Sequence, residues 1–308
     1  MIGLSFRREV FFRIGFSLLV LSSTLSLSAQ NRTKTSKTAE SEFNLRLRGG
    51  DVRIVIRNET ENPDWNRYAF EKTKGLIDSY ESYLGFPFHQ ATLPIYRSLP
   101  DSEKNKIRLV LKEAVFLNGT RVGGYNNVSG DLGKDIGIFM EAGLVPQGYP
   151  ALLLHELGHY YFTEPTWLSE GIVSFLPYIL AKKGTLRLDS EELLSVREEW
   201  SFEEKPPKKD PPLSQDFHLT DASLGPWYYS KCVRTQFILY KELGPEGYKN
   251  FLKQVAASSS LSTQSVLQLL GNIQRKDWAR ILQGWVFAGP YAVYPANSFT
   301  KAQDIEKL

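Results

Sequence analysis

Apolar and polar residues alternate in the first part of the chain, and this period of two predicts β-strands. In residues 43–57 the alternation is interrupted only around 49–51, so we expect two strands joined by a tight turn. Two further apolar runs, 107–116 and 136–140, predict a third and a fourth strand. The Gly- and Asn-rich stretch 123–127 between them predicts a turn or an irregular strand.

Apolar residues have helical spacing in 65–84 and in most of the chain after residue 149. The first of these segments stops at Gly85, as a helix commonly does. The same spacing predicts later helices at 151–162, 166–183, 190–200, 227–243, 245–257, 263–270 and 276–287. The Pro-rich stretch 203–215 predicts an exposed loop.

This order of elements predicts an α+β fold with two lobes. We expect an N-terminal lobe, residues 43–148, with a small mixed β-sheet and a helix. A mainly helical C-terminal lobe, residues 149–300, should follow it. The two together would make one domain, 43–300.

The first 42 residues have the pattern of an exported protein. Residues 1–13 are short and basic, 14–27 form an apolar run diluted by serine, and small residues precede Gln30. The run is shorter than the about 20 residues that span a bilayer. We therefore expect a signal peptide at 1–29, with an uncleaved membrane anchor as the alternative, and a flexible polar leader at 30–42. The mature chain should work in the periplasm, in the cell envelope or as a secreted protein.

Composition and charge exclude several classes of protein. The 308 residues are 42% hydrophobic and 23% charged, which is ordinary for a globular chain and unlike a disordered, collagen-like or coiled-coil one. The net charge of +3 is mostly due to arginines of the predicted signal peptide, so the remainder has no electrostatic drive towards nucleic acid. The one cysteine, Cys232, excludes an intrachain disulfide and a cysteine metal cluster. Nothing in the sequence predicts the oligomeric state.

Residues 155–159 read H-E-L-G-H, the H-E-x-x-H pattern, within an expected helix. Side chains four positions apart on a helix lie about 40° apart, so His155 and His159 should project from one face. Two imidazoles can occupy two corners of a zinc tetrahedron while Glu156 stands beside the open position as a general base. The alternative is an amphipathic helix with two surface histidines. It does not explain why residues 151–157 are mostly apolar, since unpaired polar groups are costly there.

A catalytic zinc ion needs a third protein ligand, and helix geometry favours Glu170. The helices expected before and after Pro165 should form an antiparallel hairpin between the two lobes, in which residues equidistant from the turn face each other. Glu170 then faces His159, which would complete a His₂Glu site with one position left for water.

Two other side chains compete for the role of third ligand. Glu164 lies in the connection between the two helices and is better explained as a helix-start residue. His218 is the second rival.

The hairpin resembles that of the gluzincin metallopeptidases. In that family H-E-x-x-H is followed by a W-L-x-E-G helix whose glutamate is the third zinc ligand, and residues 167–171 here read W-L-S-E-G. The spacing between His159 and Glu170 is similar to that of compact bacterial peptidase MA-like proteins and shorter than in the aminopeptidase-N and thermolysin branches. A metzincin would need a histidine six residues after His159, where Pro165 stands, so that family is excluded.

The resemblance continues downstream and covers about residues 149–287. Tyr229-Ser230-Lys231 is similar to the Y-x-K segment of aminopeptidase-N-like enzymes, which implies that the Tyr229 hydroxyl stabilises an oxyanion. The alternative is that Tyr228 or Tyr229 is simply a core aromatic residue. Cys232 is expected to be a buried small residue and not a nucleophile.

Upstream of the hairpin the resemblance is weak. Gluzincins hold the substrate backbone on a strand edge, which 123–125 or 136–140 could supply. The alternative is that these segments are an ordinary loop and a core strand. No G-A-M-E-N motif is present, so recognition of a free substrate amine has no support.

The resemblance implies a zinc metallopeptidase that hydrolyses peptide bonds outside the cytoplasm by means of a metal-activated water and Glu156. Its partner would be a peptide or protein substrate. One alternative is a catalytically silent, peptidase-like scaffold or binding protein of the cell envelope. Another is a zinc hydrolase of a non-peptide bond, such as a cell-wall amide.

Overall fold

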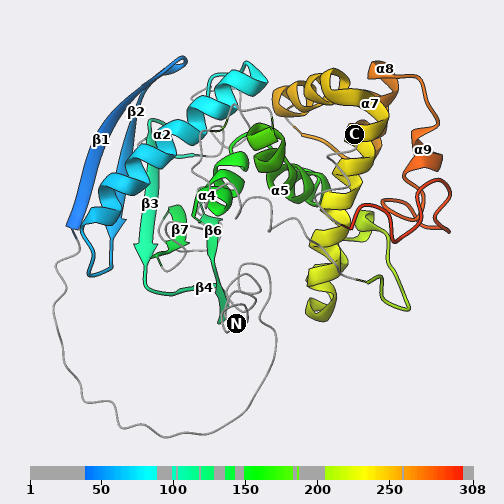
Figure 1. The fold of residues 1–308 in the computed structure, drawn as a ribbon, viewed down its shortest axis with the longest axis horizontal. Helices are drawn as coiled ribbons and strands as arrows, with labels where there is room; N and C mark the ends of the chain where they lie inside the picture. The colour runs from blue at the N-terminus through cyan, green and yellow to red at the C-terminus, as the bar shows by residue number, and fades with distance from the viewer. Residues whose placement is uncertain are drawn as a thin grey trace, which may run out of the picture.

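The computed structural model describes residues 39–88, 99–101, 103–117, 119–127, 136–142, 149–182, 186, 205–258 and 260–300. These residues form an α+β fold, with a mixed sheet in the N-terminal part and helices in the C-terminal part (Figure 1). The expected signal peptide, residues 30–38 of the expected leader and the expected helix 190–200 lie outside the described residues. Among the helices that the structure describes, none is both long enough and apolar enough to cross a membrane.

The main sheet has five strands in the order β1-β2-β3-β7-β6. They are β1 (Ala39–Leu47), β2 (Gly50–Asn58), β3 (Lys106–Lys112), β7 (Gly137–Glu141) and β6 (Gly124–Asn127). The three central strands are parallel, and each edge strand is antiparallel to its neighbour. A separate hairpin joins β4 (Val115–Leu117) to β5 (Thr120–Val122).

Two strand predictions need correction. The expected leader ended at residue 42, but β1 already begins at Ala39 because its first residues pair with the end of β2, Ala39 opposite Asn58. The single strand expected at 107–116 is two strands, since β3 ends at Lys112 and β4 begins at Val115. The chain bends between them because β4 pairs with β5 and not with the main sheet. The hairpin expected at 43–57 and a strand within 123–127 are present.

Helix α2 (Asp64–Leu84) covers one face of the sheet, as Figure 1 shows. Its buried side chains, including Leu76 and Tyr80, share one core with Ile54 and Leu109, which lie on the same face of β2 and β3. The helix ends as expected at Gly85, which adopts a left-handed conformation (φ 76°) that glycine tolerates best.

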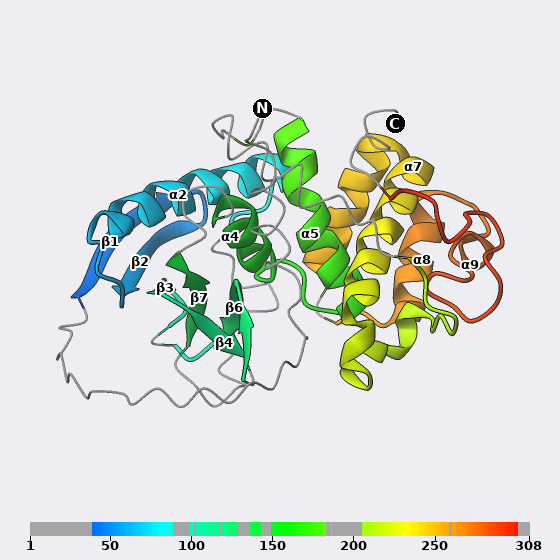
Figure 2. The same ribbon diagram turned by 60° about the horizontal axis from the view of Figure 1, so that its bottom comes forward.

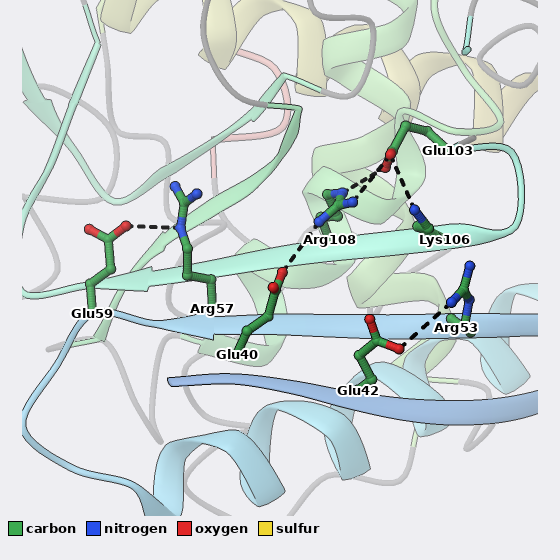
Figure 3. Close-up of polar contacts among 8 residues, drawn as sticks. All are labelled: Glu40, Glu42, Arg53, Arg57, Glu59, Glu103, Lys106 and Arg108. Carbon is green, nitrogen blue, oxygen red and sulfur yellow. Dashed lines mark hydrogen bonds and ion pairs between the residues drawn. The ribbon is translucent and has the colours of Figure 1, made fainter. Parts of the chain in front are cut away.

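The opposite face of β1, β2 and β3 carries ion pairs (Figure 3). Arg53 lies 3.7 Å from Glu42, and the Nε atom of Arg108 lies 2.6 Å from a carboxylate oxygen of Glu103. Arg53, Arg57 and Arg108 alternate there with buried residues of the other face, as the period of a strand requires, while Val55 and Val110 on the charged face are also buried.

The C-terminal part is built on α4 (Tyr149–Gly158), α5 (Thr166–Lys182), α7 (Gly225–Ala257), α8 (Thr263–Ile273) and the short α9 (Trp278–Ile281). Figure 1 and Figure 2 both show α5 between α4 and α7, so the α4–α5 hairpin joins the sheet to the other helices. The two helices expected at 227–243 and 245–257 form α7, which is kinked at Gly244 (φ 69°). The helix expected at 276–287 is wrong beyond Ile281, where Gly284 adopts a left-handed conformation (φ 84°).

Candidate metal centre

Helix α4 ends inside the H-E-x-x-H run, so the prediction of a helix through residue 162 is wrong. Its last residue is Gly158, and His159 begins the turn that leads to α5. Glycine is a poor helix former, and the turn is tightened by a hydrogen bond from the amide of Tyr160 to the carbonyl oxygen of Leu157 (3.1 Å). A Cβ atom at Gly158 would lie only 2.6 Å from the hydroxyl oxygen of Tyr80. Close packing against α2 therefore requires glycine at this helix end.

The Glu170 carboxylate, on the first turns of α5, faces both imidazoles of the motif. Its two oxygens lie 3.6 Å from Nε2 of His155 and 3.9 Å from Nε2 of His159. Two ligand atoms of one tetrahedral zinc ion are about 3.4 Å apart, since each is about 2.1 Å from the metal. The distances from the Glu170 oxygens to the two imidazoles are close to this separation.

The Glu156 carboxylate reaches the same space from the end of α4. Three possible ligand atoms lie within 4.8 Å of one another, one each from His155, Glu156 and His159. Among the residues that the structure describes, this is the one group of at least three metal-binding side chains found within that distance. Glu156 is buried (5% exposed), and its backbone carbonyl accepts a hydrogen bond from Nδ2 of Asn126 in β6 (2.8 Å). The two imidazoles are therefore approached by two carboxylates, Glu156 and Glu170.

Burial disfavours the charged forms of these groups. It raises the pKa of Glu156 well above its usual value, and the nearby Glu170 carboxylate raises it further. Burial also raises the pKa of Glu170, although His159 opposes this. For His155, burial lowers the pKa and His159 lowers it further. A cation here would stabilise ionised carboxylates and neutral imidazoles together.

Two serines of α5, which the sequence analysis did not identify, hold the outer nitrogens of the imidazoles. The hydroxyl oxygen of Ser174 lies 3.1 Å from Nδ1 of His155, and that of Ser169 lies 3.1 Å from Nδ1 of His159. Both Nε2 atoms are thereby left facing Glu170. The sequence could have indicated them by position, since Ser169 directly precedes Glu170 and Ser174 lies one helical turn after it.

The two tyrosines at the start of α7 have different surroundings. Tyr228 is fully buried, and its hydroxyl donates a hydrogen bond to Asp216 (2.6 Å). Tyr229 is half-buried, and the Glu170 carboxylate is the main cause of a strongly raised pKa of its phenol, with burial second. The charge of Glu170 therefore favours the protonated phenol of Tyr229.

The rival third ligands are held in other contacts. The ring of His218 stacks on that of Tyr228, with ring centroids 3.8 Å apart. Glu164 is exposed in the connecting turn, where its carboxylate accepts a hydrogen bond from Ser260 (3.3 Å). Of the three candidates, Glu170 is the one whose side chain faces both imidazoles.

Cys232 is buried, as expected. Burial raises the pKa of its thiol well above the usual value, and Glu170 adds to the effect.

Comparison with solved structures finds zinc metallopeptidases of similar fold. The M1 zinc metallopeptidase from Deinococcus radiodurans matches with a TM-score of 0.53 and 17% identity, over 83% of this chain and 54% of that one. A variant of a two-domain M1 zinc metallopeptidase bound to L-arginine matches with a TM-score of 0.55 and 16% identity, over 85% and 54% of the two chains. Aminopeptidase A from Legionella pneumophila, in complex with aspartic acid, matches with a TM-score of 0.54 and 12% identity, over 82% and 28%.

These matches support the gluzincin resemblance at the level of the fold alone. The chain spans about half the length of the M1 metallopeptidases and less of the aminopeptidase. No family model and no curated protein matches the sequence.

Proposed function

We propose that this protein is a zinc-dependent metallopeptidase that hydrolyses peptide bonds outside the cytoplasm. The observation that carries the proposal is the position of the Glu170 carboxylate, 3.6 Å and 3.9 Å from Nε2 of His155 and His159. The buried Glu156 carboxylate beside them and the fold shared with zinc metallopeptidases add support. Export of the chain rests on the pattern of its first 29 residues.

The proposed zinc ligands are His155, His159 and Glu170. Zinc is preferred to other metals because imidazole nitrogen and carboxylate oxygen suit it, and three protein ligands leave a position for water. When bound, the ion supplies a Lewis acid that polarises the scissile carbonyl and acidifies a water molecule.

Glu156 is the proposed general base. It accepts the proton of the attacking water and passes it to the leaving amine. Burial and the neighbouring Glu170 raise its pKa, which makes its carboxylate a stronger base than an exposed one. The hydrogen bond from the Asn126 side chain to the Glu156 backbone carbonyl connects the end of α4 to β6.

Tyr229 is the proposed donor to the oxyanion of the tetrahedral intermediate. A phenol retains its proton when nearby carboxylates raise its pKa, and it can then donate a hydrogen bond to a developing negative charge.

Strand β6 is the proposed support for the substrate backbone. It is an edge strand packed beside α4, whereas β7 has neighbours on both sides. Of the two segments considered from the sequence, the one at 123–125 therefore overlaps the last strand in the order of the described sheet, the position at which an extended peptide could add.

The test compares wild type with Glu156→Gln for zinc content and for cleavage of a mixed peptide library. We expect one zinc ion per chain in both proteins and cleavage by wild type alone, because glutamine cannot accept a proton. Glu71→Gln, a change at an exposed position of α2, should behave as wild type. Zinc without cleavage of any peptide by wild type would favour the scaffold alternative or a non-peptide substrate, and absence of zinc would contradict the proposal.

A further inference from the structure

The hydroxyl group of Ser169 joins three parts of the candidate centre. Ser169 is buried (4% exposed) and lies directly before Glu170 in α5. Its Oγ donates a hydrogen bond to the backbone carbonyl of Phe162 (2.7 Å), in the turn after α4. The same Oγ lies 3.1 Å from Nδ1 of His159.

These contacts determine which ring nitrogen of His159 carries the proton. A carbonyl oxygen can only accept, so the one hydroxyl proton of Ser169 is directed to Phe162. In the contact with His159, Ser169 must then be the acceptor, and Nδ1–H the donor. The Phe162 carbonyl oxygen, 3.4 Å from the same Nδ1, can also only accept. Both neighbours therefore favour a proton on Nδ1 and a lone pair on Nε2.

We propose that Ser169 is a positioning residue that fixes the tautomer and the orientation of His159, so that its Nε2 lone pair faces Glu170 and is ready to bind zinc. A free histidine side chain in water carries its proton mainly on Nε2, which would block that nitrogen as a ligand. Ser169 offsets this preference before any metal arrives. The inference rests on the proposed zinc site, although the tautomer itself is a property of the metal-free chain.

The contact between Ser174 and His155 does not determine a tautomer in the same way. The hydroxyl oxygen of Ser174 lies 3.1 Å from Nδ1 of His155, and either atom can be the donor. Within the described residues, a second acceptor, the Phe162 carbonyl, takes the hydroxyl proton of Ser169, whereas Ser174 has no such second acceptor. Ser169 therefore gives the sharper test.

The first measurement determines the protonated nitrogen directly. Long-range ¹⁵N–¹H correlation spectra of the metal-free wild type are recorded at a pH where the imidazoles are neutral, and the His159 ring is assigned from the signals lost in His159→Gln. We expect the proton on Nδ1 and an unprotonated Nε2. A proton on Nε2 of His159 would overturn the proposal.

The second measurement compares the zinc affinity of Ser169→Ala with that of wild type by competition with a chelator. We expect a loss of about 10- to 100-fold, the usual effect of removing a hydrogen-bond partner of a metal-binding histidine. The matched control is Ser79→Ala in α2, which also removes a buried hydroxyl bonded to a backbone carbonyl (2.8 Å to Gly75). Ser79→Ala should bind zinc as wild type does.

An affinity of Ser169→Ala within about twofold of the Ser79→Ala value would overturn the proposal. If Ser169→Ala does not fold, as judged by circular dichroism, the wild-type spectra decide alone. If wild type binds no zinc, the proposed function fails, and the spectra still test the tautomer assignment.

Discussion

Among single residues, Glu170, the proposed third zinc ligand, has the clearest test. Glu170 is half-buried, and partial burial raises its pKa, which means that its ionised form is destabilised in the fold. Its removal should therefore not unfold the chain. Glu170→Ala should lower zinc affinity by about 100-fold or more, because a direct ligand contributes more than a partner of a ligand. Zinc content after gel filtration and a thermal unfolding curve check both expectations. Glu164→Ala is the control, and full zinc content in Glu170→Ala would remove this residue from the ligand set.

A second prediction at this scale separates the two neighbouring tyrosines. Tyr229→Phe should lower kcat by about 10²- to 10³-fold and leave zinc content unchanged, since it would remove the proposed donor to the oxyanion. Tyr228→Phe removes the hydrogen bond to Asp216, so it should lower the free energy of unfolding by about 1 kcal/mol with activity retained. Peptide hydrolysis and urea unfolding of both variants give the comparison. The opposite pattern would make Tyr229 the structural residue of the pair.

Residue spacing predicts only part of such a centre. The H-E-x-x-H and W-L-S-E-G runs identify side chains whose relative positions follow from one helix or one hairpin. The partners of Ser169 and Ser174 depend instead on rotamers and on how α5 packs against the turn, which no local pattern encodes. The roles of His155, Glu156, His159, Glu170 and Tyr229 stay predictions until metal and activity are measured.

At the scale of elements, the contact between α5 and α7 depends on Gly171. A Cβ atom there would lie 2.6 Å from the backbone oxygen of Cys232 and 2.8 Å from Nε2 of Gln236. Gly171→Ala should therefore lower the free energy of unfolding by about 1–3 kcal/mol, because backbone atoms cannot move aside without separating the helices. Gly75→Ala, in α2 with nothing within 4 Å of the new Cβ, should stabilise the protein by up to about 1 kcal/mol. Urea unfolding measures both, and equal effects would contradict the packing argument.

The elements that the sequence predicts best are those whose signal is local. Helix α2 and the β1–β2 hairpin have regular periodicity and a turn or glycine at their ends. The predictions fail where tertiary contacts decide. Pairing with β5 separates β4 from β3, and packing against Tyr80 requires glycine where α4 ends.

At the scale of the whole molecule, the charged face of the sheet should make stability depend on acidity. A hydrogen bond from Arg108, partly opposed by burial, holds the pKa of Glu103 below its usual value. A lowered folded-state pKa contributes stability above the unfolded-state pKa, near 4.5, and this contribution is lost as the pH falls through the folded value. Glu103→Gln should therefore cost at most about 1 kcal/mol at neutral pH and almost nothing in acid. Unfolding curves against pH test this, with Glu71→Gln as the control, and a constant difference would exclude the ion pair as its cause.

The arrangement of strands and helices along the chain follows from sequence periodicity, and so the α+β class was predictable. Among the described residues, which strand lies at the edge of the sheet and which face α2 covers depend on pairing between distant segments. The candidate centre lies on the hairpin that joins the two parts, so its geometry depends on both.

The end of α4 at Gly158 divides the three proposed ligands among three consecutive pieces of backbone. His155 belongs to the helix, His159 to the turn and Glu170 to α5. A cation shared by them would cross-link α4, which packs beside β6, to α5, which packs against α7. Separation of these two helices would then require release of the ion first, so loss of the ion should weaken the hairpin that joins the sheet to the other helices.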